Sequence, residues 1–132
     1  MIKYLLDTNI LVDILRGKDS PVSDKLMDIG LKRCAIADLT VFELLFGAFV
    51  SEHQEKNLPL VEALTNRFSI LSSSAAYREA ARQKALLRQA GQLIEDIDLL
   101  IGCTSITNHL ILVTDNLKHM HRLENIQLES WS

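Results

Sequence analysis

Cysteine is scarce in this sequence of 132 residues, which contains only Cys34 and Cys103. Neither belongs to a CxxC pair or lies beside paired histidines, so a zinc site or a redox motif is not expected. Cys34 opens a short apolar stretch and Cys103 lies within a helical apolar pattern. We therefore expect both to be small buried side chains, as suits a reducing cytoplasm.

Long apolar runs are also missing. No uninterrupted run approaches the roughly 18 residues that a membrane-spanning helix needs. The apolar residues 1–6 are followed by Asp7 and Asp13, which interrupt the segment before it could act as a secretion signal. We expect a cytoplasmic protein without membrane contact. The length predicts a single domain over residues 1–132, and the ordinary globular composition argues against disorder.

An excess of positive charge is absent too, since the net charge is -3. This argues against a protein that binds nucleic acid through a generally basic surface. A polyanion would have to be bound by a local patch. The candidate phosphate contacts are Arg16, Lys18, Lys118 and Arg122. His119 and His121 lie in the same basic stretch, where a solvated surface is the default interpretation and a pair of catalytic imidazoles is the alternative.

Short apolar runs alternate with helical patterns along the whole chain. Strands are predicted over residues 2–6, 34–37, 68–71, 110–113 and 126–128. Helices are predicted over residues 8–16, 21–32, 75–89 and 96–108, with another from Asp38 or Thr40 to Phe49. Pro59 predicts that the helix-prone stretch 51–67 is either broken in two or begins near Leu58. The alternation predicts an α/β fold, a parallel central sheet with helices on both faces.

Four acidic segments stand beside apolar runs and contain no Lys or Arg. They are Leu5-Leu6-Asp7-Thr8-Asn9, Thr40-Val41-Phe42-Glu43-Leu44, Asp96-Ile97-Asp98-Leu99-Leu100-Ile101 and Val113-Thr114-Asp115-Asn116. Carboxylates beside a hydrophobic core need a positive partner, because desolvating an ion is costly. A hard divalent cation such as Mg²⁺ or Mn²⁺ takes oxygen ligands and would serve. The segments therefore predict a metal-dependent enzyme that acts on phosphates.

The predicted fold brings these acids together. Asp7 follows the first strand and Asp115 follows the strand over 110–113, and ligands of open parallel sheets bind outside the carboxyl ends of the strands. Glu43, Asp96 and Asp98 lie in first turns of helices, which can begin at the same edge. Asp96 and Asp98 are two residues apart and do not share a helical face, so we expect only one of them to be a main ligand.

Taken singly, each acidic residue has a simpler interpretation. Asp7, Asp38 and Asp96 could be helix N-caps, and Thr40 with Glu43 forms a capping box. Asp115-Asn116 is a common turn dipeptide. The joint occurrence of the four segments in this order favours a site.

The sequence resembles the PIN-domain ribonucleases, in particular the VapC-type toxins of toxin–antitoxin pairs. The resemblance covers the full chain and rests on Tyr4-Leu-Leu-Asp-Thr-Asn-Ile10, Thr40-Val-Phe-Glu-Leu44 with Gly47, Gly91 followed by Asp98-Leu-Leu-Ile101, Leu112-Val-Thr-Asp-Asn116 and Leu128-Glu-Ser-Trp131. It implies a three-layer α/β/α fold. It also implies that Asp7, Glu43 and Asp98 form the acidic core, with Thr8, Asn9 and Thr114 as supporting polar residues. The fourth acidic position aligns with Asn116, with Asp115 as a substitute, and Asp96 is a further metal-ligand candidate.

The resemblance further implies an endoribonuclease with one or two Mg²⁺ or Mn²⁺ ions. Hydrolysis by an activated water would leave a 5′-phosphate and a 3′-hydroxyl. A homodimer and a small antitoxin partner are expected. The helix expected to end at Phe49 and the residue after it offer more apolar surface than is needed to cover a sheet, which fits such an interface. These apolar residues are Phe42, Leu45, Phe46, Phe49 and Val50.

Other interpretations stay open at this point. A PIN-like RNA-processing nuclease without a toxin role has the same chemistry. A phosphoacceptor signalling domain needs an Asp after the middle strand, where this chain has Ser72-Ser73-Ser74. A haloacid-type phosphatase needs a second Asp where Asn9 stands. A non-catalytic RNA-binding module would gain nothing from acids that repel phosphate.

Overall fold

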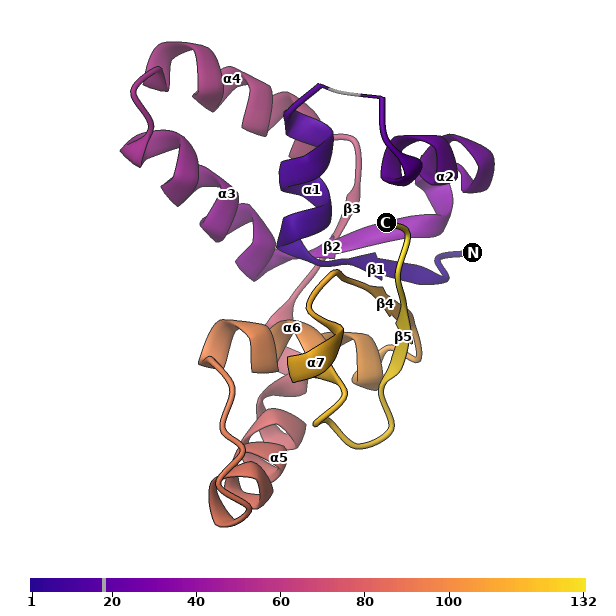
Figure 1. The fold of residues 1–132 in the computed structure, drawn as a ribbon, viewed down its shortest axis with the longest axis vertical. Coiled ribbons are helices and arrows are strands. Elements are labelled where there is room, and N and C mark those ends of the chain that lie inside the picture. Colours follow the sequence, from indigo (N-terminus) through magenta and orange to yellow (C-terminus); the bar gives the residue numbers. More distant parts are fainter. Residues whose placement is uncertain (18) are drawn as a thin grey trace.

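The computed structural model describes residues 1–17 and 19–132, which form a sheet of five parallel strands covered by helices (Figure 1). The strand order is β3-β2-β1-β4-β5, and every neighbouring pair is parallel. The strands are β1 (Tyr4–Leu6), β2 (Cys34–Ala37), β3 (Ser69–Leu71), β4 (Ile111–Val113) and β5 (Gln127–Glu129). The predicted parallel α/β fold is confirmed.

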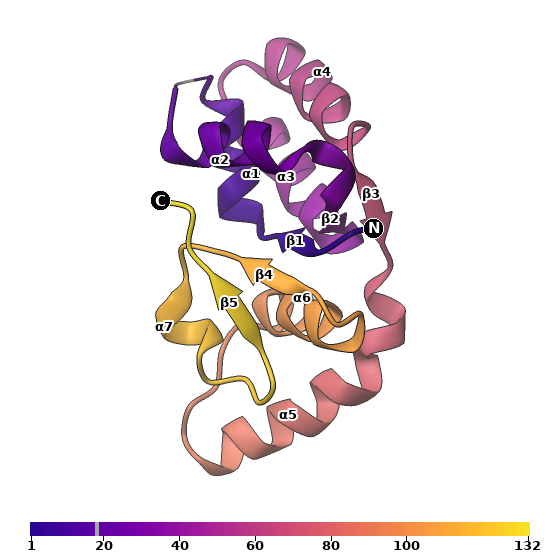
Figure 2. The ribbon, with the colours of Figure 1, turned by 90° about the vertical axis from the view of Figure 1, so that its right-hand side faces the viewer.

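Helices cover both faces of this sheet. Figures 1 and 2 show α1 to α4 on one side and α5, α6 and α7 on the other. Their bounds are α1 (Thr8–Leu15), α2 (Pro21–Ile29), α3 (Asp38–Val50), α4 (Gln54–Thr65), α5 (Tyr77–Gln89), α6 (Asp96–Thr107) and α7 (Leu117–Met120), with short 3₁₀ turns at Leu31–Arg33 and Ser73–Ala76.

Two hydrophobic cores follow from this arrangement, because successive strand residues point to opposite faces. Leu6 and Val113 belong to the core under α1 to α4, whereas their neighbours Leu5 and Leu112 belong to the core over α5 and α6. Strands buried on both faces must be apolar throughout, which explains their continuous apolar runs.

The strand order changes direction at β1, because strands are added first on one side of β1 and later on the other. The chain proceeds from β1 to β2 and β3 on one side, and then returns to β4 on the other side. Asp7 extends the ladder between β1 and β4, since its backbone N–H donates to Val113 O at 2.9 Å. The gap between the ends of β1 and β4 is therefore the switch point at which ligands of such sheets bind.

Two local expectations were wrong, and one short helix was not expected. The helix expected over residues 21–32 ends at Ile29, because Gly30 has a φ of 94°, which few other residues adopt. Neither alternative at Pro59 holds, because α4 begins at Gln54, before Leu58, and continues through the proline. Burial of Val61 and Leu64 offsets the one backbone hydrogen bond that an exposed proline removes. The four-residue helix α7 was not expected.

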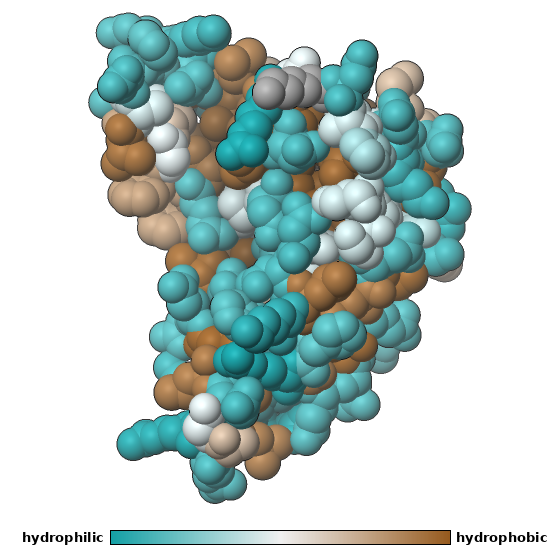
Figure 3. Space-filling view, in the orientation of Figure 1, coloured by the Kyte–Doolittle hydropathy of each residue, from teal (hydrophilic) through white to brown (hydrophobic). Residues whose placement is uncertain are grey.

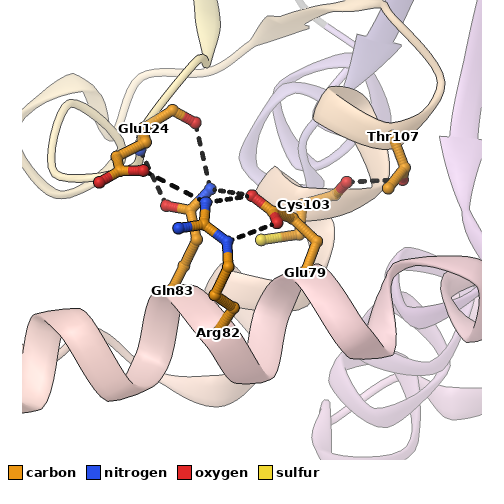
Figure 4. Close-up of polar contacts among 6 residues, drawn as sticks. All are labelled: Glu79, Arg82, Gln83, Cys103, Thr107 and Glu124. Carbon is orange, nitrogen blue, oxygen red and sulfur yellow. Dashed lines mark hydrogen bonds and ion pairs between the residues drawn. The ribbon is translucent and has the colours of Figure 1, made fainter.

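Buried Gln83 ties α5 to the segment before β5 (Figure 4). Its side chain accepts from Glu124 N at 2.8 Å and donates to Glu124 O at 3.1 Å, like a strand neighbour. The Gln83 amide also donates to Glu79 Oε2 at 2.8 Å. Hydrogen bonds from Arg82 lower the pKa of Glu79 to about 2, so this carboxylate stays ionised as an acceptor.

Both cysteines are buried, as expected, and both are reduced. Burial raises the pKa of Cys34 to about 11 and that of Cys103 to about 12, so neither is a reactive thiolate. Within residues 1–17 and 19–132, none of the helices has the length and apolar character needed to cross a membrane.

Gly102 in α6 lies against the segment that carries α7. A Cβ at this position would overlap Leu123 Cδ1 and would lie 3.4 Å from Met120 Sδ. We expect Gly102→Val to lower the free energy of unfolding by about 1 to 3 kcal/mol, because the buried neighbours must move. Urea denaturation measures this loss.

Gly47 in α3 provides the matched control, because a Cβ there meets no atom within 4 Å. Gly47→Ala is expected to leave stability unchanged or to raise it by up to about 1 kcal/mol through helix propensity. Unchanged stability of Gly102→Val would show that the α6–α7 contact is loosely packed.

Candidate active site

Asp7 lies at the switch point and is almost fully buried, with 3% of its surface exposed. It is the N-cap of α1, and its Oδ1 accepts from Thr8 N at 2.8 Å. Its Oδ2 accepts from Thr114 Oγ1, also at 2.8 Å. Burial raises the pKa of Asp7, the two hydrogen bonds lower it, and the negative charges of Glu43 and Asp115 raise it again.

Glu43 reaches the same edge of the sheet from α3. Thr8 Oγ1 donates to Glu43 Oε1 at 2.5 Å and lies 3.1 Å from Thr40 Oγ1. Thr40 is fully buried one turn before Glu43, so the two face Thr8 together. Thr8 therefore links the Asp7 cap to Glu43: its amide contacts one carboxylate and its hydroxyl the other.

Asp98 approaches from the other face, in the first turn of α6. Its surroundings raise the pKa of Asp98 to about 6, chiefly through burial and then through the negative charges of Asp7, Glu43 and Glu95. The structure thus brings Asp7, Glu43 and Asp98 close enough to repel one another electrostatically. These are the three acids that the resemblance implied as the acidic core.

Asp115 lies at the rim of this site and is exposed. Its backbone N–H donates to Asn9 Oδ1 at 3.4 Å, and its Oδ1 accepts from Ser132 Oγ at 2.5 Å. Asn116 N donates to Thr114 Oγ1 at 2.9 Å, which helps to orient the hydroxyl that contacts Asp7. Of the two candidates for the fourth acidic position, Asp115 is the one whose charge acts on Asp7.

Asp96 points elsewhere. Its Oδ1 is paired with Lys84 Nζ of α5 at 2.6 Å, and 66% of its side-chain surface is exposed. It is the first residue of α6 and Glu95 is the N-cap, so Asp96 is not a cap either. The capping alternative holds for Asp7, which is a cap and a site residue at once. Thr40 lies inside α3 and not at its start.

The proposed phosphate contacts are scattered. Arg16 is exposed at the end of α1 and lines a pocket together with Glu43, and Lys118 is exposed on α7. Arg122 donates from Nη1 to Leu93 O at 3.1 Å and Gln92 O at 3.3 Å, and so holds the loop before α6. Lys18 lies outside the described residues.

Comparison with known proteins agrees with this geometry. The family profile described as PIN domain matches residues 4–125. This chain belongs to the PIN-domain family. It is 31% identical to Ribonuclease VapC2 of Haemophilus influenzae over 132 residues, which is 99% of each chain. It is 29% identical to the tRNA(fMet)-specific endonuclease VapC of Shigella flexneri over the full length of both.

A solved structure extends the likeness to three dimensions. The PIN domain superposes on a chain of DNA-bound VapBC from Salmonella typhimurium with a TM-score of 0.93 and 28% identity, covering 100% of both chains. The predicted resemblance to VapC-type PIN ribonucleases and the PIN-like three-layer fold are confirmed.

The donor chemistry of this PIN domain suits a hard divalent cation. Asp7, Glu43 and Asp98 offer only carboxylate oxygens, and within the part of the chain that the structure describes none of them pairs with Lys or Arg. In that same part, no three His, Cys, Asp or Glu side chains are placed so that they could hold a metal ion together. Mg²⁺ keeps several waters and binds through one or two carboxylates, so an open arrangement of this kind fits it.

Three residues near the site had not been expected there. The sequence pattern of Thr40 is that of a capping box, although its spacing of three from Glu43 also places both residues on one helical face. Glu95 acts on Asp98 by charge alone, and Ser132 is brought to Asp115 from a distance of 17 residues in the sequence. No sequence pattern marks the last two.

Asp98 is expected to reduce stability at neutral pH. Its pKa is higher in the folded protein, about 6, than its ordinary value of 3.8, so the folded state favours the proton. The penalty is absent below about pH 4, grows between pH 4 and 6, and is complete above that range. In metal-free solution at pH 7.5, Asp98→Asn should raise the free energy of unfolding by about 1 to 2 kcal/mol, after allowance for solvent screening.

Urea denaturation at pH 4 and pH 7.5 measures the effect. Asp96→Asn is the matched control in the same helical turn, and should change stability by less than about 1 kcal/mol at either pH because its ion pair is exposed. An Asp98→Asn protein that is less stable than the wild type at pH 7.5 would mean that the charge mainly stabilises the start of α6.

Proposed function

We propose that this PIN domain is an endoribonuclease that uses Mg²⁺ or Mn²⁺ to hydrolyse RNA phosphodiester bonds, and that it is the toxin of a toxin–antitoxin pair. The observation that carries the proposal is the group of Asp7, Glu43 and Asp98 at the switch point of the sheet. Relatives named as VapC ribonucleases match this chain end to end, which supports the same activity here.

The residues of the site have distinct tasks in this proposal. Asp7 and Asp98 would hold the cation, with Glu43 beside them, and the bound ion would activate a water and stabilise the leaving oxygen. The Thr114 hydroxyl and the Thr8 amide keep the Asp7 carboxylate in one orientation. The Thr8 hydroxyl does the same for Glu43. These neutral donors orient the acids without competing for the cation as Lys or Arg would.

The RNA must reach an acidic site on a protein of net charge -3. Cations at the rim are therefore needed to offset repulsion of the phosphates. Arg16, just past the end of α1, lines the same pocket as Glu43, and Lys118 follows the last residue of β4 by five residues. We propose these two as the main phosphate contacts.

Cleavage of cellular RNA tests the proposed activity. With Mg²⁺ or Mn²⁺ the protein should produce 5′-phosphate and 3′-hydroxyl ends, and EDTA should abolish cleavage. Asp7→Asn should lower the rate at least about a hundredfold. Asp96→Asn should keep most of the activity, because the wild-type carboxylate is engaged by Lys84.

A second measurement separates metal binding from catalysis. Mn²⁺ at a hundredfold excess over its dissociation constant should raise the stability of the wild type by about 2.7 kcal/mol, and that of Asp98→Asn by less. Cleavage that survives EDTA but is lost when His119 and His121 are replaced would contradict the metal mechanism and favour imidazole catalysis.

A pocket next to Glu43 suits a protein partner. It has a volume of about 290 Å³ and lies between α1, α3 and α4, lined by Val12, Leu15, Arg16, Glu43, Leu44, Gly47, Ala48, Asn57, Leu60 and Val61. The outer face of α3 adds exposed aromatic side chains: Phe42, Phe46 and Phe49 are each more than half exposed. Figure 3 shows apolar side chains on the flank formed by α3 and α4.

We propose that an antitoxin segment binds this groove and thereby covers the acidic site. Solved complexes titled VapBC, from Salmonella typhimurium and Rickettsia felis, contain chains of the same fold and support a partner of this kind. The expected contribution of Leu45 is smaller, since it is half-buried against the core. We further propose that the protein forms a homodimer.

Binding of a co-encoded small protein tests the partner. Leu60→Glu is expected to weaken the complex at least tenfold, because Leu60 lines the pocket and is 45% exposed. Met27→Glu on α2 is the control, since Met27 is 84% exposed and is not among the residues that line the pocket. Light scattering gives the assembly state. An active nuclease that stays monomeric and binds no co-encoded protein would be an RNA-processing enzyme without a toxin role.

A further inference from the structure

Ser132 contacts the candidate active site although no sequence motif includes it. Its hydroxyl donates to Asp115 Oδ1 at 2.5 Å. The two residues come from different parts of the chain, since Asp115 follows β4 and Ser132 follows β5. Figures 1 and 2 show the segment after β5 passing the edge of the sheet towards the layer of α1 and α2.

The path of this segment is set by strong anchors. β5 pairs with β4 up to Glu129, which lies opposite Val113, and Thr114 N then donates to Glu129 O at 3.1 Å. Trp131 is buried, with its ring edge-on to Tyr4 at a centroid distance of 5.3 Å. The Trp131 indole N–H also donates to Glu129 Oε1 at 3.0 Å. Because Trp131 is fixed in the core, Ser132 lies next to Asp115, just after the end of β4.

Among Asp7, Glu43, Asp98 and Asp115, the Asp115 side chain is the exposed one. Asp7 and Glu43 are held by buried or half-buried hydroxyl groups, whereas the Asp115 side chain is exposed. Among residues 1–17 and 19–132, Ser132 is the one donor to its carboxylate. An exposed carboxylate without a donor samples several rotamers, and its distance to Asp7 would vary with them.

We propose that Ser132, delivered by the Trp131 anchor, is a positioning residue for the Asp115 carboxylate. The Ser132 hydroxyl engages Asp115 Oδ1, so that Asp115 Oδ2 can face a bound cation or the water that attacks the phosphate. The proposal rests on the proposed nuclease function. It adds a fourth carboxylate with a fixed orientation to those of Asp7, Glu43 and Asp98.

Two variants of Ser132 test the proposal in the full-length protein. Ser132→Ala should lower kcat/KM for RNA cleavage about three- to tenfold, as expected for loss of one hydrogen bond to a charged group. Ser132→Thr keeps the hydroxyl and should restore most of the activity. Ser130→Ala is the matched control, because Ser130 is an exposed serine of the same segment, two residues away. The melting temperatures of the three variants should agree with the wild type within about 2 °C.

A double-mutant cycle decides whether Ser132 acts through Asp115. Ser132→Ala should have no further effect on cleavage once Asp115→Ala is present. An equal loss in both backgrounds would overturn the proposal, and so would wild-type activity of Ser132→Ala or of Asp115→Ala. A loss in Ser132→Thr as large as in Ser132→Ala would also overturn it.

A readout independent of cleavage separates this proposal from the nuclease function. Mn²⁺ titration followed by electron paramagnetic resonance should give a dissociation constant about three- to tenfold weaker in Ser132→Ala than in the wild type, and no such change in the Asp115→Ala background. If the wild type cleaves no RNA, the nuclease proposal fails and this titration alone decides the role of Ser132. If Asp7→Asn abolishes cleavage but the titration shows no effect, the nuclease stands and the positioning role falls.

Discussion

Burial of the Asp7 carboxylate beside two further acids is the constraint on which this structure depends. With 3% of its surface exposed, Asp7 loses most of its hydration, and Glu43 and Asp98 add negative charge around it. Within the described residues, the protein supplies no Lys or Arg to Asp7 and stabilises it with a backbone amide and a threonine hydroxyl. Burial of the carboxylate costs free energy of folding, and a cation that neutralised the group would reduce that cost.

The fold holds the four acids close together despite the cost of burying and crowding their charges. Each acid lies on a different element: Asp7 follows β1, Glu43 lies in the second turn of α3 and not in its first turn as expected, Asp98 lies in the first turn of α6, and Asp115 follows β4. Two separate hydrophobic cores lock these elements against the sheet from both sides. The carboxylates cannot move far apart to relieve their repulsion, so pKa values rise instead, to about 6 for Asp98.

Several residues serve structure and site together. Asp7 caps α1 while it forms the centre of the acidic group, and Thr8 begins that helix while its hydroxyl holds Glu43. This is why the capping and the functional interpretations of the sequence could not be separated: for Asp7 both are correct. For Asp96 neither holds, since an exposed ion pair with Lys84 accounts for it.

The sequence by itself determined the fold class and most elements, because apolar periodicity is a local feature, whereas the acidic core of Asp7, Glu43 and Asp98 was implied by the resemblance to PIN-domain ribonucleases. It could not determine that α4 continues through Pro59, since burial of Val61 and Leu64 decides this. Nor could residue spacing alone distinguish Asp96 from Asp98, or foresee the contact between Ser132 and Asp115. These depend on which surfaces face each other once α5 packs on α6 and β5 pairs with β4. Contacts between residues far apart in the chain follow from tertiary packing, and no local pattern encodes them.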